Sequence, residues 1–247
     1  MKSSKPAEHS IRYPRLCAAL IAGGKSRRMG LDKGRIDCEG HPLWRRQWEK
    51  LHALQARETV ISGGSEGGWT DEGLPSISDQ QQDAGPLAGI ARVLEVTRCE
   101  LVLALAVDLP EMTAAYLRCL VERCGNGQGA VPVIRQRFEP LAAVYPAACR
   151  ELVATQLAAG EYSIQKFLTK AIAAGLLRPI DVAEADEKHF RNLNHPGDVM
   201  AWREGVPAWG ERSFLASAVS KDGSHLPRFH FDQDRTAFLK PQPAVLN

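Results

Sequence analysis

The sequence of 247 residues has no apolar run long enough to cross a bilayer and no large excess of charge of either sign. The apolar stretch 16–24 is short of the roughly 18 residues that a membrane span needs, and Lys25, Arg27 and Arg28 follow it. The formal net charge of +2, from 31 basic and 29 acidic residues, gives no general field that would attract nucleic acid or anionic lipid. We therefore expect neither a membrane nor a nucleic-acid partner, and any anion site must be local.

The 6 cysteines are not spaced as zinc ligands or as a compact disulfide framework, so we expect buried or half-buried free thiols. Residues 1–14 carry several charged side chains and no apolar segment, which excludes a secretory signal. This predicts a cytoplasmic protein with a flexible leader over 1–14.

Apolar residues make up 44% of the chain and charged residues 24%, which is enough for a sizeable folded core. Short apolar strands are predicted over 16–22, 58–62 and 101–107. Helices alternate with them and begin near Pro42, at Pro86 and near Thr113. This alternation predicts an α/β fold of three layers, with a mostly parallel, Rossmann-like sheet and helices on both of its faces.

The second half of the sequence predicts an antiparallel hairpin added to this sheet, because residues 130–134 and 141–145 flank a polar turn. The acidic stretch that starts at residue 181 is interpreted as solvated surface. The expected elements are helices over 146–158 and 164–174, a strand over 176–180, and a helix that opens at Pro196. We expect one domain over 15–204 and an irregular C-terminal tail over 205–247, where prolines recur without periodicity.

A basic, glycine-rich loop follows the first predicted strand and joins three glycines to four cations between residues 23 and 33. In open parallel sheets, ligands bind beyond the carboxyl ends of the strands, and glycines let backbone N–H groups approach an anion closely. Arginine adds a bidentate phosphate contact and lysine a point charge. The loop therefore predicts a polyphosphate site, and a solvated basic turn is the simpler alternative.

Two other phosphate motifs fit this loop less well. The glycine spacing does not give the G-x-G-x-x-G fingerprint of dinucleotide-binding sites. A Walker A motif is nearly matched by Gly24, Lys25 and Ser26, but Ala19 replaces its first glycine. Because apolar strand residues continue to Ala22 and no amphipathic helix follows Lys25 directly, a P-loop ATPase or GTPase is the weaker alternative.

Asp108 ends the buried strand 101–107, so it lies at the same sheet edge as the glycine-rich loop. A carboxylate in this place can hold Mg²⁺ against phosphate oxygens, which are the ligands that Mg²⁺ favours. The alternative is an aspartate that only caps the turn before Pro110.

These motifs resemble those of the molybdenum cofactor guanylyltransferases, whose nucleotidyltransferase fold also includes cytidylyl and sugar-nucleotide enzymes. The resemblance spans about 16–202 and depends on a few short segments, which are 21–24, 28–30, 32–33, 85–89 and 192–196. One departure is at the strand end, where the family usually has Pro-Cys-Asp-x-Pro and this sequence has Ala106-Val107-Asp108-Leu109-Pro110.

The resemblance implies an Mg²⁺-dependent enzyme that transfers GMP from GTP to molybdenum-molybdopterin and releases pyrophosphate. The expected catalytic residues are Arg28, Lys33 and Asp108, with Asp108 as the metal ligand, while Asn192 and Asn194 would bind the acceptor. The nucleotide would be bound by a larger set of residues: Ile21, Ala22, Gly23, Gly24, Lys25, Lys33, Ser62, Asp79, Gly85, Gly89 and Asp108.

Several alternatives remain open at this point. Asp79 could simply cap a turn, the segment 85–89 could be a tight turn before a helix, and the two asparagines could belong to an ordinary turn before Pro196. For the whole protein, the alternatives are a cytidylyl or sugar-phosphate nucleotidyltransferase of the same fold, or a non-catalytic GTP-binding regulator. Molybdoenzymes or cofactor-handling proteins are the protein partners that the resemblance suggests.

Overall fold

The computed structural model describes residues 12–23, 34, 36–38, 40–63, 69–78, 85–125, 127–193 and 196–203. Its strands are β1 (Tyr13–Ile21), β2 (Asp37–Cys38), β3 (His41–Pro42), β4 (Ala56–Ser62), β5 (Ser76–Ile77), β6 (Leu101–Ala106), β7 (Gly129–Ile134), β8 (Arg137–Phe138), β9 (Ala142–Pro146) and β10 (Leu177–Asp181). Its helices are α1 (Leu43–His52), α2 (Gly85–Val96), α3 (Ala114–Glu122), α4 (Cys149–Ala158), α5 (Ile164–Ala173), the 3₁₀ helix η2 (Glu184–Phe190) and α6 (Pro196–Arg203). None of these described helices is long and apolar enough to span a membrane.

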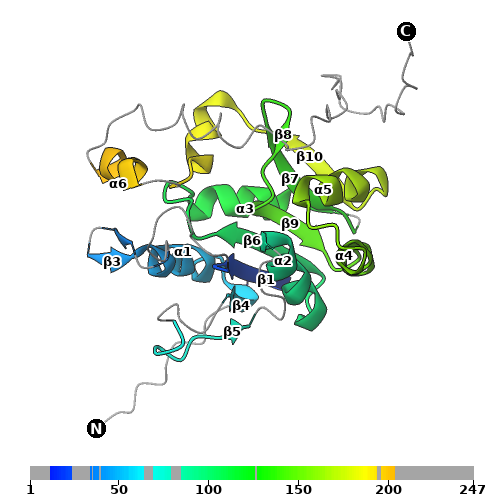
Figure 1. Ribbon diagram of the computed structural model, residues 1–247, viewed down its shortest axis with the longest axis horizontal. Coiled ribbons are helices and arrows are strands. Elements are labelled where there is room, and N and C mark those ends of the chain that lie inside the picture. Colours follow the sequence, from blue (N-terminus) through cyan, green and yellow to red (C-terminus); the bar gives the residue numbers. More distant parts are fainter. Residues whose placement is uncertain are drawn as a thin grey trace.

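The main sheet has the strand order β10-β7-β9-β6-β1-β4-β5, and β8 pairs with β7 beside this path (Figure 1). β1 is parallel to both of its neighbours, β4 and β6, and β5 continues the parallel arrangement beyond β4. At the other end, β10 is parallel to β7. A small separate hairpin is formed by β2 and β3.

Helices cover both faces of the sheet. On one face, alternate residues of β1 such as Leu16 and Leu20 pack in a buried cluster with residues of α1, α3 and α6. On the other face, Cys17 and Ala19 belong to a second buried cluster, with residues of α2, α4 and α5. In Figure 1, α4 and α5 lie to the right of the sheet and α6 to the left. Because successive strand residues point to opposite faces, the apolar strand can bury both sides, and the predicted three-layer α/β fold is confirmed.

The helix starts follow the signals in the sequence. α1 begins directly after Pro42, and the side chains of Thr113 and Ser163 accept hydrogen bonds from backbone amides in the first turns of α3 and α5. Such capping satisfies amides that have no partner inside the helix. It fixes where α3 begins after the Asp108 turn.

The predicted antiparallel hairpin exists, but its strands lie inside the sheet. β9 lies between β6 and β7 and is antiparallel to both. Arg135 and Gln136 have φ of 48° and 66°, so the chain turns tightly there and β8 pairs back on β7. The helix expected from residue 146 begins only at Cys149, because Pro146 still pairs with Leu101 in the sheet.

The acidic stretch after β10 lies at the surface as expected, where it forms η2 and its Glu187 makes an ion pair with the exposed Arg135 at 3.1 Å. One further expectation needs correction. Cys119 is an exposed thiol, whereas Cys17, Cys99 and Cys149 are buried and Cys124 is half-buried. The leader over 1–14 and the tail over 205–247 lie almost wholly outside the described residues and stay predictions.

Candidate nucleotide-transfer site

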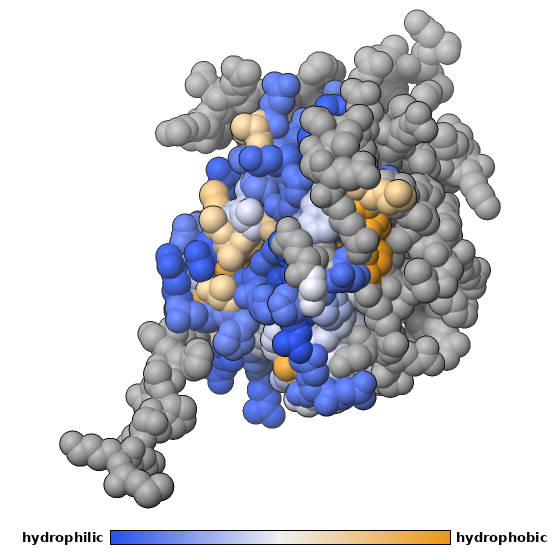
Figure 2. Space-filling model, turned by 90° about the vertical axis from the view of Figure 1, so that its left-hand side faces the viewer, coloured by the Kyte–Doolittle hydropathy of each residue, from blue (hydrophilic) through white to orange (hydrophobic). Residues whose placement is uncertain are grey.

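The carboxyl ends of four strands meet at one edge of the sheet. Ile21, the last residue of β1, pairs with Ser62 at the end of β4 and with Ala106 at the end of β6. Ser62 pairs in turn with Ile77, at the end of β5. Ligands of open parallel sheets bind beyond this kind of edge. Figure 2 views the molecule from this side, and the described part of that face is mainly hydrophilic.

The backbone after β1 is held closely against the end of β4. The amides of Ala22 and Gly23 both donate to the carbonyl of Ser62, at 2.8 and 3.2 Å. A Cβ atom at Gly63 would lie 3.2 Å from the backbone of Ala22 and Gly23, so glycine allows this approach. The start of the predicted phosphate loop is thereby fixed in the sheet, while its Gly24, Lys25, Arg28 and Lys33 lie outside the described residues.

The helix α2 begins at the same edge. Gly85, its first residue, is exposed and has a φ of 69°, which favours glycine. Gly89 is buried, and its carbonyl accepts a hydrogen bond of 3.4 Å from the hydroxyl of Ser62. Of the predicted nucleotide contacts, Ser62 and Gly89 thus connect β4 to α2, and Asp79 lies outside the described residues. The free amides at the start of α2 are suited to an anion.

Asp108 lies two residues beyond β6, in the turn that leads to α3, and is half-buried. Its carbonyl accepts a hydrogen bond of 3.0 Å from the amide of Leu193. This bond joins segments that are far apart in sequence and places half-buried Asn192 in the chain next to Asp108. The predicted metal ligand and the first of the two predicted acceptor residues are therefore neighbours, while Asn194 lies outside the described residues.

Glu139 is a carboxylate of this site that sequence reasoning did not single out. The amide of Ala106 donates to the carbonyl of Leu141 at 2.8 Å, in line with the antiparallel register of β6 and β9. The amide of Glu139 donates to the carbonyl of Pro132 in β7 at 2.8 Å, and its carboxylate lies close enough to Asp108 to feel its charge. Burial raises the pKa of Glu139 to about 7, Arg137 lowers it, and the charge of Asp108 raises it further.

The donor set suits a hard divalent cation. Asp108 and Glu139 provide two carboxylates near the end of β6, close enough for the charge of one to act on the other. Mg²⁺ in phosphoryl chemistry needs only one or two protein carboxylates, because substrate phosphates and water complete its shell. Among the described residues no group of three or more His, Cys, Asp or Glu side chains could hold a metal by itself. The residues present therefore fit Mg²⁺ that is bound together with a polyphosphate.

Comparisons with known proteins show the family of this chain. The family model described as MobA-like NTP transferase domain matches residues 18–175. A "Probable molybdenum cofactor guanylyltransferase" of Opitutus terrae is 34% identical over 186 residues, which cover 74% of this chain and 92% of the relative. A "Molybdenum cofactor guanylyltransferase" of Syntrophotalea carbinolica is 32% identical over 205 residues, with 78% and 93% covered.

Solved structures share the fold at lower identity. Molybdopterin-guanine dinucleotide biosynthesis protein A from Archaeoglobus fulgidus has a TM-score of 0.63 and 23% identity, covering 76% of this chain and 97% of that one. The 2-C-methyl-D-erythritol 4-phosphate cytidylyltransferase of Thermus thermophilus has a TM-score of 0.55 and 18% identity, covering 76% and 97%. The fold is thus one shared with nucleotidyltransferases of known structure. With the matches in sequence, the chain belongs to the MobA-like NTP transferase family.

Proposed function

We propose that this protein transfers GMP from GTP to molybdenum-bearing molybdopterin and so forms the guanine dinucleotide cofactor. The curated relatives are named for this activity and align over about three quarters of the chain. The observation that carries the proposal is the hydrogen bond from Leu193 to Asp108, because it joins the predicted acceptor segment to the predicted metal ligand beside the end of β1.

In the proposed reaction, an oxygen of the terminal phosphate of molybdopterin forms a bond to the α-phosphorus of GTP. The bond from that phosphorus to the oxygen that bridges to the β-phosphate breaks, and pyrophosphate leaves with the electron pair. Since the nucleophile is already anionic, the protein has mainly to align the two phosphates and to neutralise charge. Arg28 and Lys33, with Lys25 and the glycine amides of the loop, are proposed to contact the triphosphate.

Asp108 is the proposed Mg²⁺ ligand, and Asn192 and Asn194 are the proposed contacts of the acceptor. When bound, Mg²⁺ would supply positive charge against the phosphate oxygens. Gly85 and the amides at the start of α2, with Asp79, are proposed to contact the nucleoside. The cytoplasmic location and a role for molybdoenzymes or cofactor-handling proteins as recipients also remain proposals.

The proposal is tested by measuring pyrophosphate release and dinucleotide formation with Mg²⁺, molybdenum-loaded molybdopterin and each of GTP, ATP, CTP and UTP. We expect turnover with GTP. Turnover with CTP alone would favour the cytidylyl alternative, and GTP binding without product would favour the non-catalytic regulator.

Asp108→Asn is expected to lower kcat by about a hundredfold or more, since the variant loses a charged metal ligand. Glu100→Gln is the matched control, because Glu100 precedes β6 and therefore lies at the opposite end of the same strand, where it pairs with Arg15. Full activity of Asp108→Asn would refute the metal assignment.

A further inference from the structure

A buried glutamine interrupts the apolar face of α1. Leu43, Gln47 and Leu51 follow one another at intervals of four residues, and all three have a relative exposure of 0%. An apolar side chain is the usual occupant of such a position, because burying an amide costs free energy unless it is hydrogen-bonded. The partners of Gln47 therefore show what it does there.

The amide nitrogen of Gln47 donates to the carbonyls on both sides of Asp108. It lies 2.6 Å from the carbonyl oxygen of Leu109 and 3.4 Å from that of Val107. Val107 and Leu109 are themselves buried, so their carbonyls need partners inside the protein. Carbonyl oxygens only accept hydrogen bonds, so the donor nitrogen of Gln47 faces the turn. The side-chain oxygen of Gln47 is buried and has no partner among the described residues.

The neighbouring carbonyls of this turn are bound as well. The carbonyl of Asp108 accepts from the amide of Leu193, and that of Pro110 accepts from the ammonium of Lys50 at 2.8 Å. Four consecutive carbonyls, 107–110, are thus held by α1 and by the segment after η2. These hydrogen bonds from two other elements fix the backbone that carries the carboxylate of Asp108.

We propose that Gln47, assisted by Lys50, is a positioning residue that sets the orientation of the Asp108 carboxylate toward the metal and the triphosphate. The inference rests on the proposed function, in which Asp108 is the metal ligand. Outer residues that orient a metal ligand typically change metal affinity or activity by about 10- to 100-fold when they are replaced. Gln47 also ties the turn to α1, the helix that follows the predicted phosphate loop in the chain.

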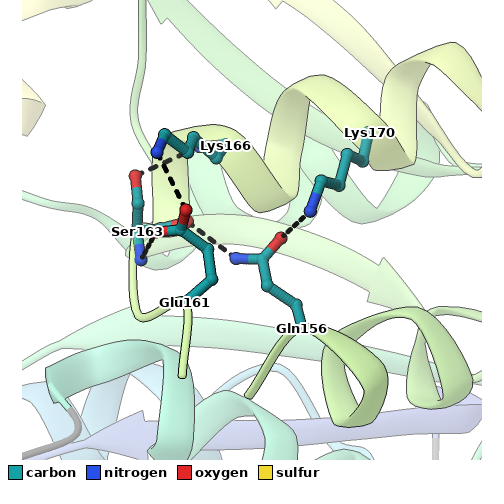
Figure 3. Close-up of polar contacts among 5 residues, drawn as sticks. All are labelled: Gln156, Glu161, Ser163, Lys166 and Lys170. Atoms are coloured by element: carbon teal, nitrogen blue, oxygen red, sulfur yellow. Dashed lines mark hydrogen bonds and ion pairs between the residues drawn. The ribbon is translucent and has the colours of Figure 1, made fainter. Parts of the chain in front are cut away.

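A matched control exists on the other side of the sheet. Gln156 in α4 is also buried, at 3% exposure, and its amide donates to the carbonyl of Ser163 at 3.0 Å (Figure 3). Its oxygen accepts from Lys170 of α5 at 3.1 Å. Replacing either glutamine with methionine removes the same amide from a buried place while keeping the length of the side chain. Only Gln47 contacts the Asp108 turn.

The experiment compares Gln47→Met, Gln156→Met, Asp108→Asn and the parent protein. Mn²⁺ serves as the probe in place of Mg²⁺, because both prefer oxygen ligands. Its binding is followed by electron paramagnetic resonance in the presence of GTP, and kcat and KM for GTP are measured beside it. We expect Gln47→Met to weaken Mn²⁺ binding and to lower kcat by about tenfold or more, with KM changed less than twofold. We expect Gln156→Met to match the parent in both readouts.

The outcomes separate this inference from the proposed function. If the parent protein transfers no GMP, but Asp108→Asn and Gln47→Met weaken Mn²⁺ binding while Gln156→Met does not, the function fails and the positioning role stands. Equal Mn²⁺ binding by the two methionine variants, or by Asp108→Asn and the parent, overturns the positioning role even if GMP is transferred. If Gln47→Met does not fold, Lys50→Met decides, because it removes a contact that is only partly buried. A twofold to fivefold weaker Mn²⁺ affinity then supports the role, and an unchanged affinity overturns it.

Discussion

Glu139 makes the folded protein sensitive to pH in a direction that can be worked out. Burial, and secondarily the charge of Asp108, raise the pKa of Glu139 from 4.5 to about 7, against the lowering effect of Arg137. Between these two values the folded chain keeps a proton that the unfolded chain has lost, so stability falls as pH rises through this window. Such a shift corresponds to about 3 kcal/mol at most, and partial exposure of Glu139 reduces it to about 1–2 kcal/mol.

Glu139→Gln removes this ionisation while keeping the shape of the side chain. We expect the variant to be about 1–2 kcal/mol more stable than the parent at pH 8 and equally stable at pH 4. Urea unfolding at pH 4, 6 and 8 measures the difference, with a chelator present so that cations do not stabilise the carboxylate. A variant that is less stable at pH 8, or a difference that does not vary with pH, would refute the reasoning.

Glu161 provides a control, because its pKa is shifted in the direction opposite to that of Glu139. Its side chain binds the ammonium of Lys166 at 2.8 Å and accepts from the amide of Ser163 (Figure 3), and the hydrogen bond from Lys166 is the main cause that lowers the pKa of Glu161. A lowered pKa contributes stability above the unfolded value, and this is lost as pH falls through the folded value. Glu161→Gln should therefore be slightly less stable than the parent at pH 8, and the difference should fade in acid.

Two further predictions concern packing and thiol chemistry. Gly129→Ala should lower the free energy of unfolding by about 3 kcal/mol or more in a urea titration, because its Cβ would lie 2.0 Å from the carbonyl oxygen of Val144. Gly125→Ala should change this free energy little, because no described atom would lie within 4 Å of its Cβ. Equal effects of the two substitutions would contradict the packing. Cys119 is exposed, whereas burial raises the pKa of Cys17 to about 12. Iodoacetamide followed by peptide mass analysis should therefore label Cys119 before Cys17, and early labelling of Cys17 would contradict its burial.

Local patterns were sufficient to predict much of the fold. The apolar run of β1 ends at its glycines, and Pro42, Thr113 and Ser163 mark helix starts that the structure confirms. The position of β9 between β6 and β7 could not be read locally, because strand order depends on pairing between distant segments. For the same reason the helix start expected at Pro146 was wrong, since its pairing with Leu101 extends the strand.

The site residues divide in the same way, into those that local patterns indicate and those that depend on contacts between distant segments. Asp108 was predicted because it directly follows a buried strand, and parallel strands place such ends at one edge. Asn192 was linked to it only through resemblance, and the structure adds the bond from Leu193 that makes them neighbours. Glu139 and Gln47 were missed, because the first depends on how the segment between β8 and β9 pairs with β7 and the second on long-range contacts of α1. For Gln47, a polar residue at the centre of an apolar helical stripe was the available signal.

A crystal structure of the protein with GTP and Mg²⁺ tests the central claim most directly. The account predicts the triphosphate beyond the ends of β1 and β6, in contact with the loop after Gly23, with the metal on the carboxylate of Asp108. A triphosphate bound at another edge of the sheet, or a metal held away from Asp108, would contradict it.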